Sequence, residues 1–372
     1  MSLLARVPLH REGLSVLDRP VIESGELSAA LFRYDSGVEA IRLRNGRGEI
    51  VVLPWMGQMV WNARFDGVDL AMRSGFAEPL PADTIAGTYG CLAFHSGLLR
   101  NGVPAPGDDH AAHGEFPCAR MRRAWIELVE EEGLRALRLV SEREHVVGFG
   151  PHYLAHPAIT LPAGEGRFSM ELEVRNRSGS PMELMYMAHV NFAFVADGRI
   201  VQPAPFDAAH VAVRRAVPAH VRPDPAYLAT IDAFAADPAP SETLRATGTY
   251  DPEQVFYLHG LGTDGSDRTA LMLRRPGGDA FALDYAPAAF GHLVRWILEG
   301  PDQGVAGFAL PSTCEPEGYG AEKRKGNVRL LPPGGSARFS VRLGHLNAAE
   351  ADREAARIAA MTSSPLPGTL PS

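Results

Sequence analysis

Hydrophobic and polar residues alternate along much of the chain, which is the pattern of half-buried β-strands. In RFSMELEVRN (167–176), every second residue from Phe168 to Val174 is apolar, and the residues between them are polar or charged. SARFSVRLGHL (336–346) repeats the spacing. Because successive strand side chains point to opposite faces, each segment predicts a strand with one buried face.

Turn signals separate these strand-like segments. Asn45-Gly46 lies between two such runs and predicts a hairpin, and RRPGGD (274–279) marks another turn. The closely spaced strands predict an all-β protein, a large sandwich of antiparallel strands with few short helices.

The segments that break the strand rhythm suggest a division of the chain. Residues 1–346 are expected to form a single β domain, in which 1–35 are an N-terminal arm and first strands. Within it, the Ala/Pro-rich region 205–250 predicts an insertion loop with some helical turns. Residues 347–372 are expected to form a C-terminal helix, centred on the Ala/Glu/Arg-rich 347–361, and a disordered tail.

One strand-like segment, ELMYMAHVNFAF (183–194), is apolar on both faces yet carries two polar residues. His189 and Asn191 are two positions apart and therefore share a face. An asparagine is costly to bury without hydrogen-bond partners. This face is therefore either a satisfied polar pair in a core or the floor of a pocket.

Three further polar clusters are candidates for chemistry. His110, His113 and Glu115 have residue types that bind zinc, although a polar surface loop has the same composition. His152 and His156 fit a loop or an edge strand better than a site. The third cluster lies in a Gly-rich turn, where carboxylates are either solvated or act as a general base; its members are Glu315, Glu317 and Glu322.

Composition and charge exclude several classes of function. The formal net charge is −8, which disfavours nucleic acid and anionic membrane surfaces as partners. Three widely spaced cysteines and no apolar run of signal-peptide or membrane-span length predict a cytoplasmic protein without disulfides. Motifs for nucleotide binding, for α/β-hydrolases and for zincin proteases are missing from the sequence.

Taken in order, several short motifs resemble the aldose 1-epimerase (galactose mutarotase-like) superfamily, and more closely a divergent bacterial subgroup of it. The resemblance runs from about Asn45 to Leu346. Its motifs are Gly97-Leu98 with Asn101, Gly102 and Pro104; His113-Gly114; Tyr186 with His189, Asn191 and Phe192; Trp296; Gly307 to Pro311; and Lys325-Gly326 with Leu331 to Gly334.

The resemblance implies a β-supersandwich fold and interconversion of the anomers of a free sugar by general acid–base catalysis, without a metal or other cofactor. It implies that His189 protonates the ring oxygen and that His113 assists at the substrate. Asn191 would orient His189 or bind a sugar hydroxyl, and His95 would add a third imidazole. Further candidates for sugar binding are Asn101, Asp284 and Trp296.

Two positions depart from the family pattern. Leu310 stands where the catalytic glutamate is expected, and Glu115 replaces an arginine. Glu315 or Glu317, with a slight preference for Glu317, would then be the base. Two alternatives remain: a non-catalytic carbohydrate-binding or regulatory protein, and a metal-assisted epimerase or lyase using His95, His110, His113 and His189. The expected partner is a small-molecule sugar, and a homo-oligomer is possible.

Overall fold

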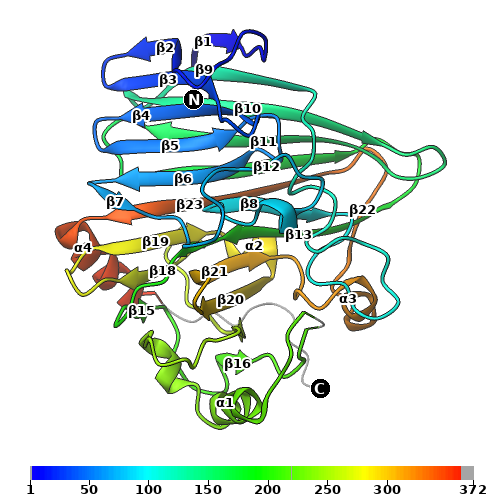
Figure 1. Ribbon diagram of the computed structural model, residues 1–372, viewed down its shortest axis with the longest axis vertical. Helices are drawn as coiled ribbons and strands as arrows, with labels where there is room; N and C mark the ends of the chain where they lie inside the picture. The colour runs from blue at the N-terminus through cyan, green and yellow to red at the C-terminus, as the bar shows by residue number, and fades with distance from the viewer. Residues whose placement is uncertain (1, 219, 362–372) are drawn as a thin grey trace.

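A computed structural model describes residues 2–218 and 220–361, which form two large antiparallel sheets (Figure 1). The first sheet has nine strands. In spatial order they are β1 (Ser2–Pro8), β9 (Arg123–Glu131), β10 (Leu134–Val146), β11 (His152–Pro162), β12 (Arg167–Asn176), β23 (Ser336–Leu346), β19 (Ala280–Tyr285), β18 (Thr269–Arg274) and β15 (Arg199–Val201).

The second sheet has fourteen strands. Its main path is β16 (Val211–Val213), β17 (Gln254–Leu258), β20 (His292–Glu299), β21 (Gly304–Ser312), β13 (Met182–Val190), β8 (Ala93–Leu98), β6 (Met59–Phe65), β5 (Gly48–Leu53), β4 (Glu39–Asn45), β3 (Leu27–Arg33) and β2 (Arg19–Ser24). Three short strands pair beside this path: β7 (Val68–Asp69), β14 (Phe192–Ala193) and β22 (Arg329–Leu331).

The two sheets pack face to face over one hydrophobic core, as the period-two pattern predicts. In β12, alternate residues from Phe168 to Val174 are buried, and they join the same cluster as Ile41 and Val52 of the other sheet. The Asn45-Gly46 turn connects β4 and β5, where the Asn45 side chain accepts hydrogen bonds from the backbone N–H groups of Arg47 and Gly48. The prediction of an all-β sandwich is confirmed.

Helices are short within the described residues, and they lie outside the sheets. They are α1 (Pro225–Ala236), α2 (Pro287–Phe290), α3 (Tyr319–Lys325) and α4 (Ala348–Ala359), with 3₁₀ turns η1 (Ile85–Thr88) and η2 (Ala239–Glu242). The helix predicted near the C-terminus is α4, and Asn347 and Glu350 cap its first turn reciprocally. The tail expected after it lies outside the described residues.

The region expected to be an insertion carries β16, α1 and η2, which lie together at the lower end of the molecule in Figure 1. Hydrogen bonding of β16 to β17 attaches this region to the edge of the larger sheet. Cys91, Cys118 and Cys314 are buried, and each has a free thiol. Across the described helices, none combines the length and apolar character needed to span a membrane.

Candidate functional site

A cavity of about 620 Å³ lies on the outer face of the larger sheet, over strands β13, β20 and β21. Its volume is in the range that encloses a small ligand. Loop segments, including η1 and the insertion, cover it. The polar side chains that line it are Tyr89, His113, His189, Arg214, His220, Glu253 and Gln303.

Side chains along β13 point alternately to the two faces of the sheet, and this alternation determines which of them face the cavity. Met187 and His189 line the cavity, whereas Tyr186 points to the other sheet, where its ring lies 4.4 Å from that of Phe339 on β23. The neighbouring strand β8 supports this floor, because Phe94 pairs with His189 in register and stacks on its ring with centroids 4.5 Å apart. Phe94 thus packs against the His189 ring and holds it at the cavity floor.

The hydrogen bonds of His189 assign its tautomer. The Asn191 amide donates to the backbone carbonyl of Cys91 (3.1 Å), so its oxygen is the atom that meets His189 Nδ1 at 2.9 Å. Nδ1 therefore carries the proton and donates it. Nε2 is then an acceptor, and the Tyr89 hydroxyl lies 3.3 Å from it.

His113 is held by an analogous chain. The Ser96 hydroxyl donates to the Asn101 side-chain oxygen, and it lies 3.1 Å from His113 Nδ1, which donates to it. The Asn101 amide in turn donates to Cys314 Sγ (3.4 Å). His113 Nε2 makes no hydrogen bond within the described part of the chain, so it is left to meet a ligand.

Backbone geometry explains why glycine follows His113. His113 has φ of 63°, and Gly114 has φ of 78°. A Cβ at position 114 would lie 2.1 Å from the carbonyl oxygen of Arg100, so only glycine fits. The turn that this permits carries the His113 ring to the cavity, 4.7 Å from the His189 ring and nearly perpendicular to it.

Burial keeps both imidazoles uncharged at neutral pH. Desolvation lowers the pKa of His113 to about 4. The pKa of His189 is held well below its ordinary value by burial and by the nearby His113. With Nδ1 protonated in each ring, the site presents two Nε2 proton acceptors.

A carboxylate reaches the same cavity from the insertion side. Glu253 forms an ion pair with Arg214 at 2.6 Å, and both side chains are only 6–7% exposed. It also accepts a hydrogen bond from Trp296 Nε1 at 2.7 Å. The Glu253 charge acts to raise the pKa of His113 against the larger effect of burial.

A family model described as "Domain of unknown function (DUF4432)" matches residues 35–344. The chain belongs to the DUF4432 family. A search of functionally curated proteins found no match for this DUF4432 protein.

Solved structures share its fold. A protein from Klebsiella pneumoniae subsp. pneumoniae, provisionally named an aldose 1-epimerase, has a TM-score of 0.78 and 13% identity, over 98% of this chain and 100% of its own. A galactose mutarotase-like protein from Clostridium acetobutylicum has a TM-score of 0.57 and 13% identity, over 87% of this chain and 100% of its own. The DUF4432 protein therefore has the galactose mutarotase-like β-supersandwich fold.

The structure brings together only some of the residues expected at the site. His113, His189 and Trp296 line the cavity of the DUF4432 protein, and Asn191 and Asn101 lie behind the two imidazoles as hydrogen-bond partners. Leu310, at the position of the expected glutamate, also lines the cavity.

Other candidates lie elsewhere. His95 points into the core between the sheets, because it alternates with Phe94 and Ser96, and its Nδ1 lies 2.9 Å from the Tyr186 hydroxyl. Asp284, on β19 of the other sheet, pairs with Arg268 and Arg167. His152 and His156 pair with Glu144 and Glu142 at partly exposed positions.

Glu315 and Glu317, the expected bases, are not among the residues that line the cavity. Lys325 Nζ lies 2.5 Å from Glu315 and 2.6 Å from Glu317, and the Tyr257 hydroxyl donates to Glu317 at 2.8 Å. Together with Glu322 they are the only group of three potential metal ligands found within the described residues, and Lys325 pairs with all three. The Lys325 ammonium group therefore already occupies the centre of this acidic turn and offsets part of its charge.

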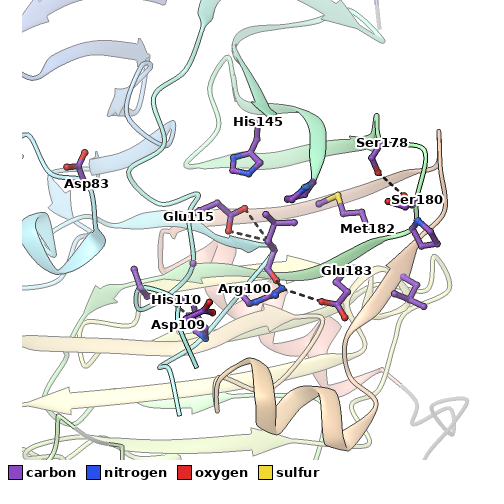
Figure 2. Close-up of a pocket in the computed structure, with 16 residues that line it drawn as sticks. Asp83, Arg100, Asp109, His110, Glu115, His145, Ser178, Ser180, Met182 and Glu183 are labelled. Carbon is purple, nitrogen blue, oxygen red and sulfur yellow. Dashed lines mark hydrogen bonds and ion pairs between the residues drawn. The ribbon is translucent and has the colours of Figure 1, made fainter. Parts of the chain in front are cut away.

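The loop that suggested a metal site divides its side chains between two cavities. His110 and Glu115 line a second cavity of about 800 Å³ (Figure 2), while His113 lines the first. Glu115 accepts hydrogen bonds from the backbone N–H groups of Leu98 and Leu99 and from the Tyr153 hydroxyl. Glu115 therefore anchors the loop, and the three predicted ligands do not converge.

Sequence reasoning missed Tyr89, Arg214 and Glu253. Each is a single polar residue without a motif around it, and Arg214 and Glu253 are 39 positions apart in the chain. The only signal in the sequence was the position of Glu253 at the end of the Ala/Pro-rich region, directly before a strand-like run.

Because His95 is buried in its neutral form, acidic pH is expected to lower the free energy of unfolding. Burial lowers the pKa of His95 to about 3, whereas an unfolded chain binds a proton on histidine near pH 6.5. Between these values the unfolded state takes up a proton that the folded state does not. The free energy of unfolding therefore falls as the pH falls, by about 1.4 kcal/mol per pH unit for this residue.

His95→Gln is accordingly expected to make this dependence shallower by about that amount between roughly pH 5.5 and pH 4. Urea unfolding at a series of pH values measures it. His10→Gln is the control, because the His10 side chain is exposed. Equal slopes for wild type and His95→Gln would contradict the prediction.

Proposed function

We propose that this DUF4432 protein interconverts the anomers of a free aldose, acting as an aldose 1-epimerase-like isomerase. The observation that supports this most is the pair of neutral imidazoles, His113 and His189, whose rings lie 4.7 Å apart and line one cavity of suitable volume. The likeness of its fold to galactose mutarotase-like proteins supports a sugar as the ligand.

In the proposed reaction, the C1 hydroxyl of the sugar donates its proton to His113 Nε2. The bond between C1 and the ring oxygen breaks as the C1 carbonyl forms, and the ring oxygen takes the proton. Both oxygens are bonded to C1, so one imidazole can serve both as base and as acid. Rotation about C1–C2 and the reverse steps give the other anomer.

The surrounding groups support this proton movement. The charge on Glu253 favours the imidazolium form that His113 passes through. The Tyr89 hydroxyl donates to His189 Nε2, and the Tyr89 oxygen remains an acceptor for a sugar hydroxyl. In this scheme His189 begins as an acceptor, so it can protonate the ring oxygen only after taking up a proton itself.

The test is an NMR exchange assay of α/β interconversion across a panel of free aldoses. The protein is expected to accelerate exchange of at least one sugar above the rate in buffer alone. The acceleration is expected to be constant near neutral pH and to fall as the pH drops through about 4, where His113 becomes protonated. Circular dichroism at each pH separates this loss from acid unfolding. No acceleration with any aldose would contradict the proposal.

The second candidate is a sugar-binding protein without catalysis. Leu310 supports it, because an apolar side chain lines the cavity at the position of the expected glutamate. Calorimetric binding of a free aldose without accelerated exchange would favour this candidate.

A further inference from the structure

Most of the wall of the first cavity is apolar. Beside the seven polar side chains and Trp296, aliphatic side chains from separate parts of the chain line this cavity. The larger ones include Ile85, Met187, Val221, Val255, Val294 and Leu310.

Several of the polar groups in this cavity are already engaged. The Glu253 carboxylate accepts from Arg214 and Trp296, and the Tyr89 hydroxyl lies against His189 Nε2. A hexopyranose brings a hydroxyl on nearly every carbon. Each hydroxyl buried without a partner costs about 1–3 kcal/mol, so a fully hydroxylated sugar matches this wall poorly.

Among the described residues that line this cavity, no arginine or lysine is free to meet an anionic substituent. Arg214, the arginine that lines it, is neutralised at 2.6 Å by Glu253, and both are almost fully buried. Binding a phosphate or carboxylate there would require breaking a buried ion pair, which is strongly unfavourable.

We infer that the ligand is an aldose in which hydroxyls are replaced by hydrogen or capped by methyl, that is, a deoxy or O-methyl sugar. This inference rests on the proposed function, because it concerns the same site. The anomeric end of the sugar meets His113 and His189. Its deoxygenated part lies against the aliphatic wall and Trp296, where contact with carbon releases water favourably.

The experiment compares sugars that differ from a parent at one carbon. Glucose is paired with 2-deoxyglucose, 6-deoxyglucose and 3-O-methylglucose, and galactose with 6-deoxygalactose. We expect at least one modified sugar to exceed its parent in kcat/KM for anomer exchange by about 10–100-fold. Parents that are equal to or better than all their modified partners would overturn the inference, while leaving the proposed function intact.

Binding of the same pairs is measured by calorimetry, which separates the two proposals. Tighter binding of a modified sugar without turnover would support the inference and contradict the proposed function. Val221→Thr and Leu310→Gln add a hydrogen-bonding group to the wall and are expected to reduce the preference. Val146→Thr, at a side chain 66% exposed outside the cavity, is the control. An unchanged preference in both wall variants would count against the inference.

Discussion

Replacing His113 with alanine is expected to lower kcat/KM for anomer exchange about 10²–10⁴-fold while the fold is retained. His113 lines the cavity, and its Nε2 has no hydrogen-bond partner within the described part of the chain. The other imidazole on the cavity floor, His189, already meets the Tyr89 hydroxyl with its Nε2. The NMR exchange assay, with circular dichroism as a check of folding, measures the effect.

His110→Ala provides the matched control. His110 lies three residues from His113 on the same loop but faces the second cavity (Figure 2). The activity of His110→Ala should therefore stay near that of wild type. His113→Ala and His189→Ala combined should cost little more than the larger single effect, because the two rings act as a unit. Full activity in His113→Ala would contradict the proposal that His113 carries the proton.

Glu253→Ala is expected to reduce the free energy of unfolding by about 3–5 kcal/mol. The substitution leaves the Arg214 guanidinium buried and charged without its carboxylate, and it removes the acceptor of the Trp296 indole N–H. Chemical denaturation at neutral pH measures the change.

Asp232→Ala is the control for this prediction. Asp232 pairs with Arg215 at the same distance of 2.6 Å, but the two side chains are 67% and 63% exposed. Its loss should cost less than about 1 kcal/mol. Combining Glu253→Ala with Arg214→Met, which removes the orphaned charge, should recover much of the lost stability. Similar small losses for Glu253→Ala and Asp232→Ala would show that burial does not strengthen this pair.

The sequence predicted those features that depend on neighbours along the chain. The alternation of apolar and polar residues predicted the strands, and Asn45-Gly46 predicted a hairpin. The alternation within 183–194 placed His189 and Asn191 on one face, where they form a hydrogen bond. The C-terminal helix was predictable because its cap and its composition are both local.

The rest of the site depends on which strands are neighbours and which face each presents. His95 belongs to the strand beside His189, but its side chain alternates away from the cavity. Glu315 and Glu317 are close to the site in sequence, yet Lys325 holds them outside it. Glu253 and Arg214 meet only because β16 and β17 pair, a contact that no local pattern encodes.

Mutations in the floor of the cavity and mutations in its cover are expected to have different effects. Its floor is hydrogen-bonded sheet, where a one-residue slip would exchange His189 for a core side chain. Its cover comes from η1, the loop that carries His113, and the insertion, all of which lie outside the floor strands β13, β20 and β21. Mutations in η1 and in the insertion can alter which ligands are admitted without disturbing the proton-transferring pair. Ligand preference can thus change in the covering segments while the sheet floor is kept.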